Sequence, residues 1–346
     1  MKKLRTAVAG LGRIGWGYHI PNIIKHEGFE LVAVTDPLSE RLEEARVNYS
    51  VKGYTDFNKL LEEEKLDLIV VASPTPFHVT QSIAAMEHGV DVFLEKPMAQ
   101  SYEEAKHIVE CMKKTGRKLM VYQPHRATSE TQAILSILER GLIGQLYMIK
   151  MARSSYIRRN DWQSLKKYGG GMLNNYGAHH IDQLLYLASS KAKKISCSMR
   201  RIASLGDADD VVKAVIETEN GIILDLDINM ASAIPLSPWT IMGSRGTVVQ
   251  ERKSDGKVIF KVRYYKEEEA PALELFDQLA AKGRSYSNFD NLKWYEEEIS
   301  ISDFKPIDFY DKCYEYYALN GHPFVPAEQT LEVMRVMQEC RIDAGW

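Results

Sequence analysis

The segment Leu4–Gly15, which reads LRTAVAGLGRIG, joins a short apolar run to a glycine signature of the form G-x-G-x-x-G. The apolar run is typical of a buried strand, and the signature is expected to open the following helix. In such a turn Gly10 makes the tight bend, Gly12 lets the backbone approach a pyrophosphate, and Gly15 lets helix and strand pack closely. The helix N-terminus offers N–H groups to the phosphates. The segment therefore predicts the start of a dinucleotide-binding domain.

An acidic residue completes this signature at the expected distance. Asp36 lies 21 residues beyond Gly15 and directly follows a predicted strand at 29–35. A carboxylate there accepts hydrogen bonds from the ribose hydroxyls and repels a 2′-phosphate, so NAD is predicted in preference to NADP. Arg13 and Ile14, inside the glycine loop, are expected to contact the cofactor as well. A glycine-rich turn followed by a surface aspartate is the alternative interpretation.

Strands and helices alternate through the first 125 residues. Largely apolar runs predict the strands, and helix-type spacing with capping residues predicts the helices between them. Such alternation indicates an α/β fold in which a doubly wound parallel sheet is covered by helices on both faces. The further strands are predicted at 66–72, 90–94 and 118–122, and the helices at 14–26, 39–48, 79–88 and 101–115.

Three of these strands are followed by residues that are mostly polar. The carboxyl ends of the strands in a doubly wound sheet face the cofactor cleft, so these residues are expected to contact the cofactor. They are Ser73, Pro74 and His78 after strand 66–72, Glu95 and Lys96 after strand 90–94, and Gln123 after strand 118–122.

The pattern changes after the first domain, which we place at residues 1–125. One helix is expected at 171–188, and strands then follow one another without helices between them, which predicts an α+β domain with an open antiparallel sheet at 126–346. The charged run 263–269 is interpreted as a solvated loop. The predicted strands are 194–202, 210–217, 221–229, 239–242, 247–250 and 258–262, and two late helices are predicted at 307–320 and 327–344, the last packing back on the first domain.

Composition excludes several classes of partner. The chain has 346 residues and a formal net charge of −3, which predicts no nucleic-acid partner. No apolar run reaches the roughly 18 residues of a membrane span, so no membrane partner is expected. The four cysteines form no C-x-x-C pair and are expected to be reduced thiols in a cytoplasmic protein. The histidines show no metal-ligand spacing, so no metal site is predicted.

Several motifs together resemble the glucose–fructose oxidoreductase, inositol dehydrogenase and rhizopine catabolism (Gfo/Idh/MocA) family. The resemblance implies a Rossmann domain followed by an α+β domain whose open sheet forms homodimers or homotetramers. It also implies hydride transfer between a nicotinamide and a ring hydroxyl or ketone of a sugar, cyclitol or derivative. The motifs are the glycine loop, SPTPFH at 73–78, EKP at 95–97, GLIG at 141–144, GGGMLNNYGAHHID at 169–182, MGSRG at 242–246 and NGHPFVP at 320–326.

The resemblance also implies roles for particular residues. Lys96 matches the active-site lysine of the family, His179 matches its histidine, and Asp182 matches an acidic residue that would orient His179. Asn175 departs from the pattern, because many relatives have aspartate there, and an amide can hydrogen-bond without carrying a proton. The hypothesis is that His179 exchanges the substrate proton, whereas Lys96 orients and polarises the substrate oxygen.

The remaining substrate contacts are left with alternatives. Polar and aromatic residues before and within the glycine-rich helix suit a polyol, although the segment before the glycine run is alternatively a solvated loop. His179 is alternatively a core histidine, with His180 facing the cleft. The pair His125 and Arg126 either lines the cleft or joins the two domains. The residues expected to contact the substrate are Lys96, Tyr156, Arg158, Trp162, Asn175, Tyr176 and His179.

Two other functions remain open from the sequence. One is an enzyme that uses bound NAD in a transient oxidation to cleave a glycoside or rearrange a sugar. The other is a non-catalytic regulator that senses NAD or a sugar, which Asn175 favours and the presence of Lys96 and His179 opposes. The sequence does not name the substrate, since selectivity depends on loops that no motif specifies.

Overall fold

Two sheets organise the chain in this computed structural model, which describes residues 3–273 and 291–346. The first sheet is parallel, in the order β3-β2-β1-β4-β5-β6, and the order reverses between β1 and β4. Ligands of such sheets bind outside the carboxyl ends of the strands at that reversal. Its strands are β1 (Leu4–Ala9), β2 (Phe29–Thr35), β3 (Lys52–Tyr54), β4 (Leu68–Val71), β5 (Asp91–Leu94) and β6 (Leu119–Val121).

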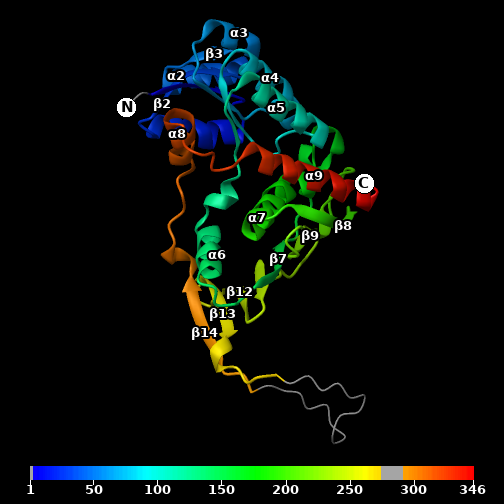
Figure 1. Ribbon diagram of the computed structural model, residues 1–346. Coiled ribbons are helices and arrows are strands. Elements are labelled where there is room, and N and C mark those ends of the chain that lie inside the picture. The colour runs from blue at the N-terminus through cyan, green and yellow to red at the C-terminus, as the bar shows by residue number, and fades with distance from the viewer. Residues whose placement is uncertain (1–2, 274–290) are drawn as a thin grey trace, which may run out of the picture.

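Helices cover both faces of the parallel sheet (Figure 1). One face packs against side chains of α1 (Ile20–Lys25), α2 (Ser39–Tyr49) and α8 (Phe309–Leu319). The other face packs against α3 (Phe57–Glu63), α4 (His78–Glu87), α5 (Tyr102–Thr115) and α9 (Ala327–Ala344). The predicted doubly wound sheet is therefore confirmed.

The second sheet has eight strands in the order β14-β13-β12-β11-β7-β10-β9-β8. All its pairings are antiparallel except β7 with β10, which is parallel, so the predicted open antiparallel sheet is confirmed apart from that pair. Its strands are β7 (Leu146–Ser154), β8 (Ala192–Arg200), β9 (Val211–Thr218), β10 (Ile223–Asn229), β11 (Trp239–Gly243), β12 (Gly246–Arg252), β13 (Val258–Tyr265) and β14 (Trp294–Ser300).

Some elements differ from the sequence prediction. The helix expected over 14–26 begins as a π-helical turn, Gly15–His19, which continues directly into α1, and Pro21 lies in the first turn of α1. Strands β7 and β14 and helix α6 (Ser129–Glu139) were not predicted. The interpretation of run 263–269 as a loop is wrong in its first part, because β13 continues to Tyr265 and pairs there with β14.

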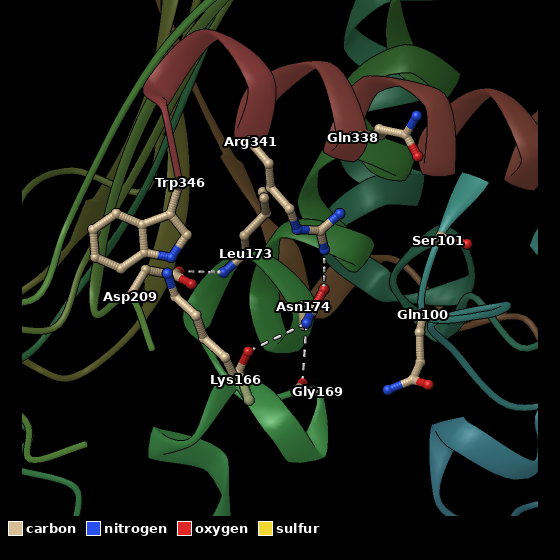
Figure 2. Close-up of a pocket in the computed structure, with 11 residues that line it drawn as sticks. Gln100, Ser101, Lys166, Gly169, Leu173, Asn174, Asp209, Gln338, Arg341 and Trp346 are labelled. Atoms are coloured by element: carbon tan, nitrogen blue, oxygen red, sulfur yellow. Dashed lines mark hydrogen bonds between the residues drawn. The ribbon is translucent and has the colours of Figure 1, made fainter. Parts of the chain in front are cut away.

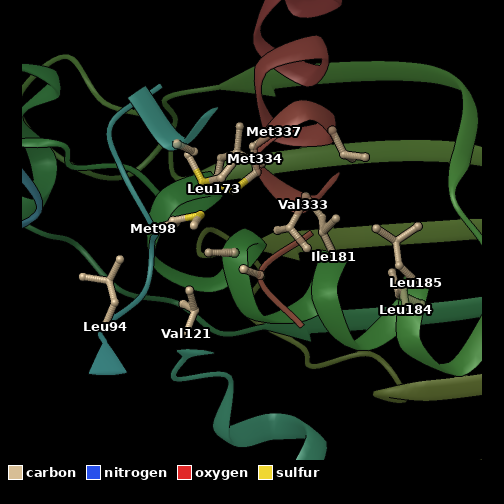
Figure 3. Close-up of a cluster of buried hydrophobic side chains, with 14 of the residues drawn as sticks. Leu94, Met98, Val121, Leu173, Ile181, Leu184, Leu185, Val333, Met334 and Met337 are labelled. Atoms are coloured by element: carbon tan, nitrogen blue, oxygen red, sulfur yellow. The ribbon is translucent and has the colours of Figure 1, made fainter. Parts of the chain in front are cut away.

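The helix expected over 171–188 lies between the two sheets. It begins as a π-helical turn, Leu173–Gly177, in which the N–H of Ala178 donates to the carbonyl of Leu173, and it continues as α7 (Ala178–Ala188). Its apolar residues join a cluster that reaches the parallel sheet and α9 (Figure 3). Labelled members of this cluster include Leu94, Met98 and Val121 from the first domain, Leu173 and Ile181 from the helix, and Val333 and Met337 from α9.

Helix α9 crosses between the first domain and the second sheet (Figure 1). It packs against α5 of the first domain, and against α7 and β8 of the second. The two domains therefore share one apolar core. Within the described part of the chain, no helix is both long and apolar enough to cross a bilayer.

Candidate active site

The glycine loop after β1 has the shape that a pyrophosphate requires. Gly10 has φ of +90°, and a Cβ there would lie 2.6 Å from the backbone of Ser73. A Cβ at Gly15 would lie 1.9 Å from the carbonyl oxygen of Gly10, whereas a Cβ at Gly12 would meet nothing within 4 Å. The fold itself therefore requires Gly10 and Gly15 to be glycine. Gly12 borders open space, where a ligand can approach the backbone.

Asp36 stands directly after β2, beside this loop. Its buried carboxylate accepts hydrogen bonds from the backbone N–H groups of Leu11 (2.8 Å) and Leu38 (3.0 Å), and Arg41 donates to it at 3.2 Å. A carboxylate has about four acceptor positions, so one remains for a ribose hydroxyl. The loop, its open face and this carboxylate together fit a dinucleotide.

Lys96 follows β5 and reaches across to the second domain. Its Nζ donates a hydrogen bond to the backbone carbonyl of Asn175, in the π-helical turn, at 3.0 Å. Burial lowers the pKa of Lys96, the carboxylate of Glu95 opposes that shift, and the nearby charge of Arg13 adds to it. The ammonium group is therefore held between the two domains in an environment that weakens its hold on its proton.

His179 lies in the first turn of α7 and is buried, with 9% of its surface exposed. Its ring stacks on that of His125 with centroids 4.4 Å apart and planes 11° apart, and its Nδ1 has no hydrogen-bond partner among the described residues. Burial, and then the charge of Lys96, hold the pKa of His179 well below 6.5. Burial likewise lowers the pKa of His125 to about 4 and that of His180 to about 3. These imidazoles are therefore neutral at pH 7.

His78 and Gln123, which were also expected at the cofactor cleft, are buried and form hydrogen bonds to backbone carbonyls. Both ring nitrogens of His78 lie 2.9 Å from carbonyl oxygens, those of Pro97 and Ser73, so the ring links the loops after β4 and β5. Gln123 donates from Nε2 to the carbonyl of Ala178 at 3.2 Å. Ser73 and Pro74 follow β4, and the Ser73 hydroxyl bonds to Gln81. These contacts fix the loops that surround the cleft.

The expectation that Asp182 orients His179 is wrong. Both carboxylate oxygens of Asp182 accept hydrogen bonds from the guanidinium of Arg126, at 2.8 and 2.6 Å, and the two side chains are almost completely buried. Arg126 lies in the crossover Pro124–Ala127 after β6, so this pair joins the first domain to α7. Of the alternatives for His125 and Arg126, Arg126 therefore joins the domains, while His125 stacks on His179.

The structure brings together only some of the residues expected at the substrate site. Lys96, Asn175 and His179 form one group, with His125 added to it. The ring of Tyr176 stacks on that of His180 with centroids 6.1 Å apart, and the guanidinium of Arg153 lies over the Tyr176 ring, 5.1 Å from its centroid. Tyr156, Arg158 and Trp162 are exposed on the segment after β7, and no contact of theirs with Lys96 or His179 is found in the described part of the chain.

Arg153 was missed as a member of this group, because β7 was not predicted. For His125 a place at the cleft was one of the two alternatives left open, and the structure stacks it on His179.

A cavity of about 310 Å³ lies between the domains on the far side of the same turn (Figure 2). The side chain of Asn174 faces it, accepting a hydrogen bond from Arg341 and donating to the carbonyl of Gly169, whereas the carbonyl of Asn175 faces Lys96. None of the residues predicted for the site is among those that line this cavity. This cavity therefore does not mark the predicted site. The candidate active site is placed at Lys96 and His179 because these side chains can exchange a substrate proton and polarise a substrate oxygen.

Comparison with family models covers most of the chain. The model described as "Oxidoreductase family, NAD-binding Rossmann fold" matches residues 4–123, and the "GFO/IDH/MocA C-terminal domain" model matches residues 131–249. The chain belongs to the Gfo/Idh/MocA family. Its N-terminal domain is therefore an NAD-binding Rossmann domain, and the resemblance read from the motifs is confirmed.

Curated relatives of this Gfo/Idh/MocA protein differ in their named reactions. A scyllo-inositol 2-dehydrogenase (NAD(+)) of Bacillus subtilis is 28% identical over 238 residues, covering 66% of this chain and 68% of the relative. A 2,7-anhydro-N-acetylneuraminate hydratase of Mediterraneibacter gnavus is 25% identical over 256 residues, covering 72% and 67%. The crystal structure of the WlbA dehydrogenase of Bordetella pertussis, in complex with NADH and UDP-GlcNAcA, shares the fold with a TM-score of 0.77 and 21% identity over 99% of this chain and 97% of that one.

The first prediction separates cofactor binding from folding at the glycine loop. Because a Cβ at Gly12 meets nothing, Gly12→Ala should change the free energy of unfolding by less than about 1 kcal/mol. The same methyl group lies where a pyrophosphate would approach, so NAD affinity should fall by about tenfold or more. Thermal unfolding and calorimetric titration with NAD measure the two effects. Gly15→Ala is the contrasting variant, because its clash with Gly10 should lower the Tm. Unchanged NAD affinity in Gly12→Ala would contradict the assignment of the loop.

The second prediction concerns the buried pair of Arg126 and Asp182. Asp182→Asn leaves the guanidinium buried without a countercharge, which should destabilise the fold by about 3–5 kcal/mol. The exposed pair of Glu43 and Arg46 provides the control, and Glu43→Gln should leave the unfolding midpoint close to that of the parent. Urea unfolding curves of both variants measure the difference. Equal midpoints would show that Arg126 does not depend on Asp182.

Proposed function

We propose that this protein is an NAD-dependent dehydrogenase that transfers hydride between nicotinamide and a ring hydroxyl or ketone of a sugar, cyclitol or derivative. The observation that carries the proposal is the position of Lys96, which follows β5 at the carboxyl edge of the dinucleotide-binding sheet, bonds to the turn that leads to the buried His179, and lowers the pKa of that histidine by its charge. The named reaction of the inositol dehydrogenase relative supports the same class of substrate.

The residues present divide the chemistry between them. NAD, held by the Gly10–Gly15 loop and Asp36, would supply the hydride acceptor. His179, kept unprotonated by burial, takes the hydroxyl proton as the C–H and O–H bonds of the alcohol break and a carbonyl forms. Lys96 donates a hydrogen bond to the same oxygen and stabilises the negative charge that develops on it. In the reverse direction Lys96 polarises the carbonyl, and His179 returns the proton.

Asn175, which stands where many relatives have aspartate, is compatible with this assignment. It holds Lys96 through its backbone carbonyl, which any residue at this position would offer. The replacement of aspartate by asparagine therefore leaves this contact with Lys96 in place. This favours an enzyme over a non-catalytic sensor of NAD or a sugar.

A second candidate function is the transient oxidation that the sequence left open, and a relative whose named reaction is that of a hydratase favours keeping it. An enzyme that oxidises its substrate transiently, with tightly bound NAD, would use the same lysine and histidine yet show no net change of cofactor. Copurified NAD that is not released during turnover would favour this reaction. The expected homodimer or homotetramer and the cytoplasmic location stay predictions, and light scattering during gel filtration measures the first.

The third prediction is the outcome of a substrate panel. Sugars, inositols and keto-sugars are incubated with NAD or NADP, and the absorbance of the reduced nicotinamide is followed. At least one polyol should give net reduction of NAD, with NADP slower because the carboxylate of Asp36 repels a 2′-phosphate. Faster turnover with NADP would contradict the role of Asp36. No net reduction with any polyol, together with conversion of the substrate, would support the transient-oxidation reaction instead.

The fourth prediction tests the two catalytic residues. Lys96→Ala and His179→Ala should each lower the hydride-transfer rate by more than about tenfold, because positioned acid–base groups contribute at least that much. Single-turnover kinetics at saturating NAD measure the rate. His88→Ala and Lys167→Ala, which alter exposed residues of the same types, are the controls and should retain the parental rate. Losses below tenfold in both test variants would refute the mechanism.

A further inference from the structure

A buried chain of polar groups leads from α8 to the residue beside Lys96. The Nδ1 atom of His19 lies 2.8 Å from the hydroxyl of Tyr310, and its Nε2 lies 2.9 Å from Oε1 of Glu95. The other carboxylate oxygen of Glu95 accepts the backbone N–H of Lys96 at 3.1 Å. His19 and Tyr310 are each 1% exposed and Glu95 is 7% exposed, so this chain is shielded from bulk solvent.

Hydrogen-bond chemistry fixes the direction of this chain. When His19 is neutral, the Tyr310 hydroxyl donates to Nδ1, and the ring proton sits on Nε2 and points at Glu95. When His19 is charged, Nδ1–H donates to the Tyr310 oxygen, whose own proton reaches the carbonyl of His19 at 3.4 Å. In both states Nε2–H donates to Glu95. Burial raises the pKa of Tyr310 well above its usual range, so its hydroxyl keeps its proton.

Without the Tyr310 hydroxyl, Nδ1 of His19 loses the donor that polarises the ring. Aromatic rings of Tyr18, Phe93 and Tyr122 surround His19. The ring proton stays on Nε2, where it faces the Glu95 carboxylate, but its hydrogen bond to Glu95 loses the strengthening that linked hydrogen bonds give one another. Glu95 is then held less firmly beside Lys96.

Glu95 matters because of the charges around Lys96. Burial and the charge of Arg13 disfavour the ammonium form of Lys96, and the Glu95 carboxylate is the charge that supports it. The other titratable groups that interact with Lys96 are the imidazoles of His125, His179 and His180, which are neutral at pH 7. Glu95 itself interacts with His19, His78, Tyr18, Tyr122 and Tyr310.

We propose that Tyr310 and His19 are positioning residues for the dehydrogenase reaction, acting through Glu95 to hold Lys96 charged and in place. The inference rests on the proposed function, in which Lys96 polarises the substrate oxygen. It also gives a role to α8, which follows the second domain in sequence and returns to pack on the first. None of the three groups in the chain needs to touch the substrate.

The closing experiment compares two tyrosines of the same helix. Tyr310→Phe removes the hydroxyl that bonds to His19, and Tyr317→Phe removes an equally buried hydroxyl that donates to the carbonyl of Val92 on β5 at 2.5 Å. Both variants lose one buried hydrogen bond from α8 to the first domain, and only one of them lies on the chain to Lys96. Both variants should therefore lose stability, whereas only Tyr310→Phe should change the properties of Lys96.

In Tyr310→Phe we expect kcat to fall by about fivefold to tenfold, with the Kd for NAD unchanged, since a positioned group is displaced without loss of the cofactor site. The alkaline limb of the kcat profile should move down by about half to one pH unit, because a Glu95 carboxylate that is held less firmly gives weaker support to the ammonium of Lys96. Tyr317→Phe should leave the limb in place. Glu95→Gln, which removes the carboxylate charge, should move it further in the same direction.

A second measurement needs neither substrate nor cofactor. Nitrogen NMR of labelled histidine in the cofactor-free protein should show His19 protonated on Nε2 in the parent and in Tyr310→Phe, with the Nδ1 resonance shifted in Tyr310→Phe because Nδ1 loses its hydrogen-bond donor. The Lys96 side-chain resonance, assigned by its loss in Lys96→Ala, should titrate at lower pH in Tyr310→Phe and Glu95→Gln than in the parent and Tyr317→Phe. Equal titration in the parent, Tyr310→Phe and Glu95→Gln would overturn the inference whatever the activity. A retained shift in a protein that turns over no polyol would refute the proposed function alone.

Discussion

The site depends on the way one helix is fastened to the carboxyl edge of the parallel sheet. Three side chains that follow the neighbouring strands β5 and β6 reach the segment 173–188: Lys96 bonds to the carbonyl of Asn175, Gln123 to that of Ala178, and Arg126 to the carboxylate of Asp182. An apolar cluster shared with α9 lies beneath them. His179 stands between the second and third of these contacts. Its place next to the cofactor loops is therefore set by the domain junction.

This junction combines two kinds of interaction with different consequences. Apolar packing of Leu94, Met98 and Ile181 supplies the stabilising free energy but accepts more than one arrangement of similar volume. The buried pair of Arg126 and Asp182 adds little net stability, because burial raises the pKa of Asp182 even beside the guanidinium. Its two hydrogen bonds nevertheless fix the position of α7 relative to the crossover after β6. Packing therefore holds the domains together, and the polar contacts determine where His179 lies.

The parts of this structure that could be predicted from the sequence are those with local causes. Gly10, Gly15 and Asp36 were identifiable because their constraints involve one turn and one strand end. Strand β14 was hidden because its three consecutive glutamates obscure the alternation of a strand. Their charges are compensated from other elements: Glu296 pairs with Lys261 and Arg263 of β13, Glu297 with Arg140, and Glu298 with Lys253. The partner of Asp182 could not be read from helix spacing, since Arg126 is 56 residues away in the chain. The two π-helical turns leave no periodic signal of their own in so few residues.

The asparagine at 175 acquires a different meaning once these contacts are considered together. An aspartate there would put a second carboxylate on the residue whose backbone carbonyl accepts the hydrogen bond from Lys96, in addition to Glu95. With asparagine, Glu95 is the one carboxylate in the described part of the chain whose charge acts on Lys96. Support for the charged form of Lys96 against burial and Arg13 then comes from Glu95, and Glu95 in turn accepts the hydrogen bond from His19 that Tyr310 strengthens. The departure from the family pattern at one position therefore increases the importance of a buried chain of residues on the opposite side of Lys96.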